Sequence, residues 1–150
     1  ERNAALGAQQ PYDFAAWPAD AVILNLGTND WNAFHNPPWV DPETGRSFKQ
    51  TLADDGSFAP ADAARLAAAV RNFLALVRKH NPHAVMLGSG LLPLLRDGLD
   101  QYRTVSGDER VYLLELPEAR GDTIGARQHP GAAAHRAAAN CLAEFLRSVL

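Results

Sequence analysis

Two turns of this chain carry side chains that could support the cleavage of an ester. Asn29 lies in a Gly-Thr-Asn-Asp turn, and His129 lies about a hundred residues later, before Pro130. Cleavage through a serine needs a nucleophile, a base that takes its proton, and donors aimed at the developing oxyanion. The amide of Asn29 fits the donor, and removing one such donor typically costs about 3 kcal/mol in barrier. The imidazole of His129 is the side-chain type that the base needs.

A buried strand is predicted just before the first turn. Residues 21–26 form a nearly continuous apolar run with two β-branched members, which is typical of a strand in a parallel sheet covered on both faces. Gly27 can turn the chain without a Cβ penalty, so Asn29 and Asp30 stand at the carboxyl end of the strand, where open α/β sheets bind ligands. Asn and Asp are also common turn residues, so an ordinary structural turn is the alternative interpretation.

This strand and turn resemble the third sequence block of the SGNH hydrolases, which is Gly-x-Asn-Asp after a buried strand. A second piece of the family pattern is present as Gln128-His129-Pro130, in the correct order along the chain. The residues before the strand are similar to those of the acetyl-esterase branch called carbohydrate esterase family 2; they are Tyr12-Asp13-Phe14, Trp17 and Asp20.

The resemblance implies an esterase that removes O-acetyl or other short acyl groups from carbohydrate, or that cleaves a small ester. It assigns His129 as general base and then general acid, and Asn29 as an oxyanion donor. Gly27 and Asp30 would support the turn, with Asp30 accepting hydrogen bonds from backbone N–H groups. No metal and no organic cofactor is implied. On the family resemblance only, the protein is expected to be secreted or periplasmic and bacterial.

Two parts of the family pattern are absent from this chain. The fifth block is Asp-x-x-His-Pro, and Ala126 occupies the aspartate position. We expect a backbone carbonyl to orient His129, as the resemblance implies, and the alternative is Asp122 from the neighbouring loop. No Gly-Asp-Ser block precedes the first strand, and Ser89 in Gly-Ser-Gly follows the wrong strand. We therefore expect a segment outside this chain to supply the serine, and this chain alone to be inactive.

Alternating helix and strand patterns predict an α/β fold. We expect helices over 61–80, within 91–105 and from 131 onward, and strands over 84–87 and 111–116. The resemblance implies a three-layer α/β/α sandwich around a parallel sheet, the flavodoxin-like SGNH hydrolase fold, with strand order 2-1-3-4-5. Residues 1–150 would be one domain that holds the last three of these strands. The strand over 21–26 would then be a bare apolar edge, so we expect an amino-terminal segment or a separate chain to complete the sheet.

A long loop is predicted over residues 31–60, where Pro and Gly residues interrupt any regular pattern. Loops of this length in a compact domain are usually functional or disordered. Trp31 and Trp39 make the loop aromatic, and its position directly after the Asn-Asp turn favours contact with a substrate. We interpret the two tryptophans as a possible sugar-stacking wall; a lid packed on its own sheet is the alternative.

Three other functions are consistent with parts of the sequence. A non-catalytic carbohydrate-binding or scaffold protein would keep the fold and lack the serine. A flavodoxin-like binding domain would need a Gly-rich phosphate loop before a helix, and none is present. A hydrolytic metal site could use Asp30, His35 and His129, but their spacing matches no metal motif.

The amino-acid composition and charge narrow the possible classes of protein further. Hydrophobic residues make up 47% of the chain, enough for a core, and 14 Lys and Arg oppose 17 Asp and Glu. This balance predicts neither a nucleic-acid partner nor an anionic membrane surface. No apolar run approaches the ~20 residues that span a bilayer. The start carries no visible export signal and no methionine, so we expect the true amino terminus upstream, and the lone Cys141 leaves the compartment undecided.

Overall fold

A three-stranded parallel sheet forms the centre of the computed structural model, which describes residues 12–89 and 93–150. Its strands lie in the order β1 (Ala21–Leu24), β4 (Val85–Ser89) and β5 (Val111–Leu114). The predicted parallel strands are confirmed, with different ends. β1 stops at Leu24 and β5 at Leu114, whereas β4 continues to Ser89, two residues beyond the predicted 84–87.

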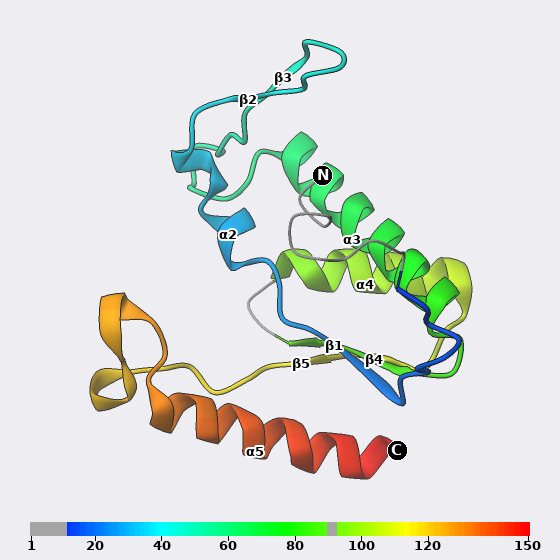
Figure 1. The fold of residues 1–150 in the computed structure, drawn as a ribbon. Helices are drawn as coiled ribbons and strands as arrows, with labels where there is room; N and C mark the ends of the chain where they lie inside the picture. The colour runs from blue at the N-terminus through cyan, green and yellow to red at the C-terminus, as the bar shows by residue number, and fades with distance from the viewer. Residues whose placement is uncertain (1–11, 90–92) are drawn as a thin grey trace.

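Helices cover both faces of the sheet, which confirms the predicted three-layer arrangement. α3 (Pro60–His80) and α4 (Pro93–Ser106) lie on one face, and α5 (Ala132–Val149) lies on the other (Figure 1). Pro60 suits the first turn of α3 because the N–H that proline lacks has no partner inside a helix there. None of the described helices is long and apolar enough to cross a membrane.

The hydrophobic core fills the space between the sheet and the pair α3 and α4. Met86 of β4 and Val111 of β5 are fully buried there, and Leu74 of α3 and Leu99 of α4 pack against them. The two helices approach closely at Gly98, where an added Cβ would lie 2.5 Å from the Cβ of Val70. Glycine is therefore required for this helix packing.

The outer edge of β1 is open in the described part of the chain. β1 pairs with β4 on one side, and no described strand pairs with it on the other. Ile23 of β1 and Leu26, just beyond it, are exposed large apolar side chains. The segment that we expect to complete the sheet stays a prediction, since no described residues pair with this edge.

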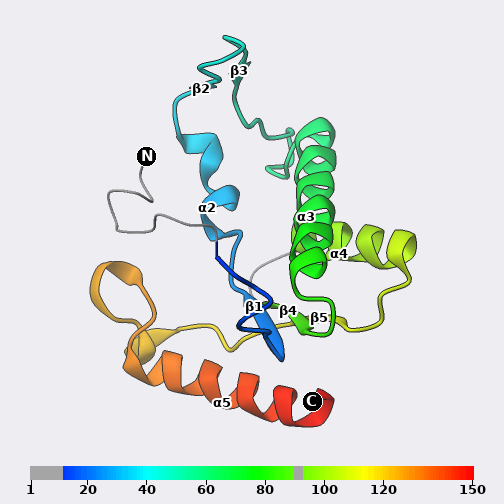
Figure 2. The same ribbon diagram turned by 45° about the vertical axis from the view of Figure 1, so that its right-hand side comes forward.

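The region that we predicted as a loop over residues 31–60 contains a short β-hairpin. It consists of η1 (Ala33–His35) followed by the antiparallel strands β2 (Trp39–Val40) and β3 (Ser47–Phe48). The hairpin projects away from the sheet, beyond α2 (Thr28–Trp31) (Figures 1 and 2). Its base is fixed to α3 by the buried carboxylate of Asp62, whose Oδ2 accepts hydrogen bonds from the backbone N (2.8 Å) and Oγ1 (2.7 Å) of Thr51.

Candidate functional site

The two segments that carry the predicted site residues emerge from the same edge of the sheet. α2 (Thr28–Trp31) follows β1, and the turns η2 (Gly121–Thr123) and η3 (Ala126–Gln128) follow β5. Because the strands are parallel, both segments begin at the carboxyl edge, and both lie on that side of the sheet (Figures 1 and 2). This edge is where open α/β sheets bind ligands.

A glycine with a left-handed backbone begins the Asn29 turn. Gly27 has φ 110° and ψ −20°, a conformation that side chains with a Cβ rarely adopt. It directs the chain into the single helical turn of α2, on which Asn29 and Asp30 are both exposed. Asp30 is the acidic residue in the first turn of α2, and its predicted support of the turn stays a prediction.

The segment around His129 is a tight loop closed on itself. The N–H of Gly125 donates to the carbonyl of His129 at 2.6 Å, and the N–H of Gly131 donates to the carbonyl of Thr123 at 2.8 Å. A Cβ added at Gly131 would lie 2.9 Å from that Thr123 oxygen, closer than real Cβ atoms approach. The two glycines therefore allow the two sides of the loop to pass each other at backbone contact distance, and His129 is exposed between them.

Backbone strain is concentrated immediately before His129. Arg127 (φ 53°) and Gln128 (φ 62°) both have left-handed conformations, although neither is glycine. This conformation costs a residue with a Cβ roughly 1–2 kcal/mol, and such strain clusters at functional sites. Nothing in the residue types predicts it, because Arg and Gln are not the residues that usually adopt this conformation.

Asp122, the alternative residue for orienting His129, is exposed on η2, and His129 is exposed in the loop that follows. A group that orients the base therefore remains a prediction for this site.

The described serine hydroxyls that make hydrogen bonds are occupied elsewhere. Ser57 donates to Asp55 Oδ1 at 2.6 Å, while the hydroxyls of Ser106 and Ser148 donate to carbonyls of their own helices. The side chain of Ser89 lies outside what the structure describes. No described serine thus pairs with the predicted base, and the nucleophile also remains a prediction.

Two cavities lie beside α2, and Asp30 lines both. The first, the apolar cavity, has a volume of about 190 Å³ and is lined by Gly27 together with leucine, valine and phenylalanine side chains from β1, α3, α4 and β5. The second, the polar cavity, has a volume of about 300 Å³ and lies between α2, β3 and the start of α3. The Asn29 turn therefore separates an apolar space from a polar one.

The predicted aromatic wall is only partly described and lies away from His129. Trp39 is 59% exposed on β2, with its ring centroid 5.7 Å from that of Phe48. In both ribbon views the hairpin lies on the opposite side of α2 from the loop before α5, so Trp39 is not brought next to His129 (Figures 1 and 2). The side chain of Trp31 lies outside the described part of the structure.

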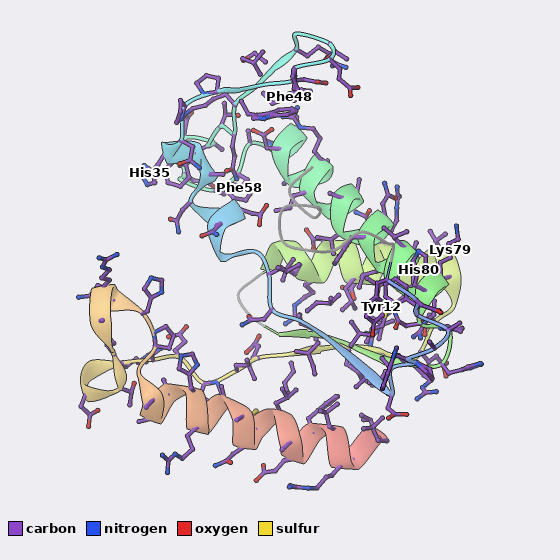
Figure 3. All side chains as sticks on the ribbon, in the orientation of Figure 1. Tyr12, His35, Phe48, Phe58, Lys79 and His80 are labelled. Carbon is purple, nitrogen blue, oxygen red and sulfur yellow. The ribbon has the colours of Figure 1, made fainter. Side chains whose placement is uncertain are left out.

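The alternative metal site receives no support from the described side chains. His35 lies near the hairpin with Phe48 and Phe58 (Figure 3), and its ring packs on Phe34 at a centroid distance of 3.9 Å. Across residues 12–89 and 93–150, no group of three His, Cys, Asp or Glu side chains is arranged to hold a metal ion.

Solved structures of carbohydrate esterases are similar to this chain, whereas no family model matches it. The acetyl xylan esterase Est2A from the rumen bacterium Butyrivibrio proteoclasticus aligns with a TM-score of 0.88 and 37% identity, over 99% of this chain and 41% of that chain. A family two carbohydrate esterase from Clostridium thermocellum, in complex with cellohexaose, aligns with a TM-score of 0.64 and 24% identity, over 95% of this chain and 39% of that chain.

A curated relative agrees with these structures. The cellulase/esterase CelE of Acetivibrio thermocellus is 27% identical over an alignment that covers 93% of this chain and 15% of CelE. The predicted resemblance to carbohydrate esterase family 2 is thus confirmed, and so is the SGNH fold. The chain spans about two fifths of the solved relatives and a smaller share of CelE.

Proposed function

We propose that this chain is part of an SGNH-type esterase that removes O-acetyl or other short acyl groups from a polysaccharide. One observation carries the proposal: a chain 37% identical to part of an acetyl xylan esterase brings the Asn29 turn and the His129 loop to the same edge of its sheet. A family resemblance without this placement would leave the two residues unconnected. The whole protein, rather than this chain alone, would carry the activity.

The proposed reaction uses an amide and an imidazole from this chain and a serine from a segment outside it. His129 takes the proton of the serine hydroxyl as its oxygen attacks the ester carbonyl, and the Asn29 amide donates to the oxygen that becomes negative. His129 then gives the proton to the departing sugar oxygen, which leaves an acyl-serine. In the second half, His129 takes a proton from water as its oxygen attacks the acyl-serine. His129 then gives this proton to the serine oxygen as the bond to the acyl carbon breaks, which releases the carboxylic acid and the free serine.

The apolar cavity suits the acyl side of this reaction. Gly27 lies between Asn29 and the buried strand and also lines the cavity, so a small acyl group bound there would keep its carbonyl close to the amide donor. Apolar lining without hydrogen-bond donors favours a methyl or short alkyl group over a charged one. This placement supports a short acyl group.

The open edge of β1 supports a second part of the proposal. An amino-terminal segment or a separate chain would pair with β1 and complete the sheet, and the same segment would deliver the serine. Exposed Ile23 and Leu26 favour this arrangement, since an unpaired apolar edge strand is prone to association. By family resemblance we also propose a secreted or periplasmic location. Trp39 would contact a sugar unit distant from the scissile ester.

Hydrolysis of 4-nitrophenyl acetate by the full-length protein tests the proposal. His129→Ala is expected to lower kcat by about a thousandfold or more, and Asn29→Ala by about a hundredfold. His135→Ala and Asn140→Ala replace exposed residues of the same types on α5 and are expected to retain the activity. Equal rates for the His129→Ala and His135→Ala variants would remove histidine catalysis from this proposal.

A non-catalytic carbohydrate-binding protein is the alternative. The observation that favours it is the absence of a serine paired with His129 among the described residues. One solved relative is described as a carbohydrate esterase whose active site displays divergent catalytic and non-catalytic binding functions. Saturable binding of a xylo-oligosaccharide, with no ester hydrolysis by the full-length protein, would support this alternative.

A further inference from the structure

The polar cavity beside α2 has the composition of a site for an uncharged, hydroxyl-rich ligand. Two cationic side chains (Lys49 and Arg65) and two carboxylates (Asp30 and Asp62) line it, so their formal charges cancel. Phe48 adds an aromatic surface to the lining. Sugar rings bind in such places because their hydroxyls both donate and accept hydrogen bonds while their C–H faces contact aromatic rings.

Three of the four charged groups already make contacts that hold the cavity in shape. Asp62 pairs with Arg65 and accepts hydrogen bonds from Thr51, which joins the segment after β3 to the start of α3. Lys49 Nζ donates to the carbonyl of Phe34 at 2.8 Å and also to that of Asn36, which joins β3 to η1. Both oxygens of Asp62 are thus matched by donors, and the Lys49 ammonium uses two of its three N–H donors within the protein.

The cavity keeps both donors and acceptors for a ligand, since Arg65 uses only part of its five N–H donors in the pair with Asp62. Gln50 Oε1 is buried and has no hydrogen-bond partner among the described residues. The exposed carboxylate of Asp30 adds a second acceptor to the lining. A buried acceptor without a donor costs about 1–3 kcal/mol, so a ligand that supplies a hydroxyl there gains this amount. The last torsion of glutamine is broad, which allows its amide to turn toward such a hydroxyl.

We propose that the polar cavity binds one neutral pyranose unit of the polysaccharide, on the alcohol side of the scissile ester. The inference rests on the proposed esterase function and adds the subsite and its ligand class to it. Asp30 lines both cavities and follows Asn29 directly, so the acyl group and the sugar lie on opposite sides of the same turn. Gln50 is the residue that makes this subsite selective for a hydroxyl.

The test compares two substrates in the full-length protein and its Gln50→Leu variant. Leucine fills a similar volume without the unpaired oxygen, so stability is expected to stay the same or increase. The ratio of kcat/KM for acetylated xylotriose to kcat/KM for 4-nitrophenyl acetate, which has no sugar, is expected to fall about tenfold. The matched control is Gln101→Leu, on the exposed face of α4, and it is expected to leave the ratio unchanged. An unchanged ratio in Gln50→Leu overturns the subsite.

Binding of unacetylated xylotriose, followed by NMR, separates this inference from the proposed function. Binding that weakens in Gln50→Leu, in a protein without esterase activity, would support the subsite and reject the esterase. Esterase activity without any change in xylotriose binding between the wild type and Gln50→Leu would reject the subsite and keep the esterase. Tighter binding of methyl glucuronoside than of methyl xyloside would also overturn the proposal, because the cavity would then select an anion.

Discussion

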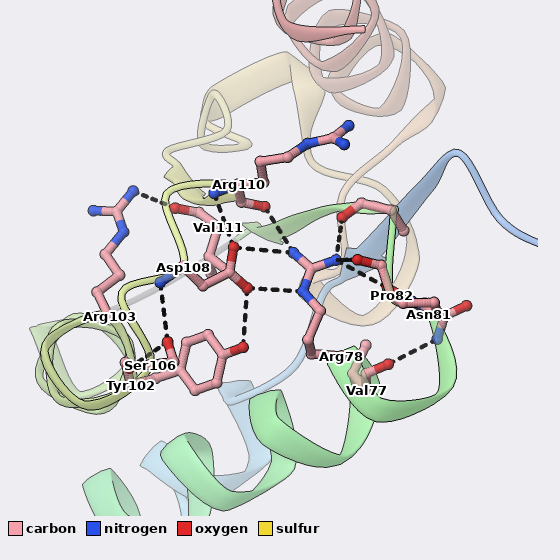
Figure 4. Close-up of polar contacts among 11 residues, drawn as sticks. Val77, Arg78, Asn81, Pro82, Tyr102, Arg103, Ser106, Asp108, Arg110 and Val111 are labelled. Carbon is pink, nitrogen blue, oxygen red and sulfur yellow. Dashed lines mark hydrogen bonds and ion pairs between the residues drawn. The ribbon is translucent and has the colours of Figure 1, made fainter.

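Arg78 and Asp108 form an ion pair that joins the ends of two helices to the sheet. Arg78 Nε donates to Asp108 Oδ2 at 2.8 Å, and Arg78 Nη2 donates to Asp108 Oδ1 at 3.2 Å (Figure 4). Arg78 Nη1 also donates to the carbonyl of Ala84 at 2.6 Å, just before β4, and Tyr102 Oη donates to Asp108 Oδ2 at 2.9 Å. The cluster lies at the amino-terminal edge of the sheet, opposite the candidate site, so we assign it to stability.

Arg78→Leu is expected to destabilise the protein by about 3 kcal/mol, because it leaves the mostly buried Asp108 carboxylate without a paired cation and the Ala84 carbonyl without the Arg78 donor. The two side chains of the pair are only 18% and 14% exposed. The matched control is Arg96→Leu, which breaks the pair with Glu115, whose side chains are 57% and 80% exposed. Its loss should cost less than about 1 kcal/mol. Urea unfolding measures both, and equal effects would contradict the structural role of Arg78.

The Arg78–Asp108 pair also predicts how the free energy of unfolding depends on pH in the acidic range. Burial raises the pKa of Asp108, but hydrogen bonds from Arg78, the backbone N–H of Arg110 and Tyr102 outweigh it and hold the pKa below the ordinary 3.8. Because the pKa of Asp108 is lower in the folded state, its ionised carboxylate contributes to the free energy of unfolding. This contribution is complete at pH values above 3.8 and is lost as the pH falls through the lowered pKa.

Asp108→Asn should therefore flatten the decrease in unfolding free energy between about pH 5 and about pH 2. Tyr102→Phe removes only one of the three donors, so its pH dependence should lie between those of the wild type and Asp108→Asn. Urea midpoints measured across this range test the order. If the unfolding free energy fell equally steeply with pH in all three proteins, Asp108 would not control the loss of stability in acid.

For the substitution of Gly98 by alanine, helix propensity alone would predict the wrong sign of the change in stability. Alanine is usually better than glycine inside a helix by about 1 kcal/mol. At this position the new Cβ would meet Val70 Cγ1 at 2.7 Å and the carbonyl of Ala67 at 2.8 Å, both on α3. Overpacking of this kind costs about 1–3 kcal/mol, so Gly98→Ala should lower the stability. Thr104→Ala, on the exposed face of the same helix, should change it by less than about 0.5 kcal/mol in the same thermal unfolding measurement.

The pattern of apolar residues in the sequence was sufficient to predict the elements whose pattern extends over enough residues to be recognised. The apolar spacing of α3 and α5 and the apolar run of β1 predicted their type and nearly their ends. The hairpin was missed because two residues per strand are too few to show alternation. Its turn did carry a signal, since the side chain of Asp41 accepts from the N–H of Glu43 at 2.9 Å and Gly45 has φ +68°.

The candidate site was predictable only where a local motif marks it. Asn29 and His129 stand in short motifs, so each could be found from its neighbours. Gln50 stands in no motif, and it belongs to a site only because β3 folds back against α2 and α3. The left-handed conformations of Arg127 and Gln128 were also unpredictable, because the loop closure by Gly125 and Gly131 imposes them against the preference of both residues.

Gly131→Ala should change catalysis through the shape of the loop that holds His129. The new Cβ would lie 2.9 Å from the Thr123 oxygen, which is backbone and accepts the hydrogen bond from Gly131 itself, so the loop must shift. A displacement of a base by about 1 Å can cost a hundredfold in rate, and we expect kcat for 4-nitrophenyl acetate to fall at least tenfold in the full-length protein. Because the clash is local, the circular dichroism spectrum should remain that of the wild type.

Gly121→Ala is the matched control for this prediction, in the same segment. Gly121 has φ +55° but no atom within 4 Å of an added Cβ, so alanine there adds roughly 1 kcal/mol of backbone strain without a clash. It should lower the unfolding free energy slightly and leave kcat unchanged. If both variants kept full activity, the close approach of Gly131 to Thr123 would serve folding only. If both lost activity equally, strain anywhere in the segment, rather than the position of His129, would limit the reaction.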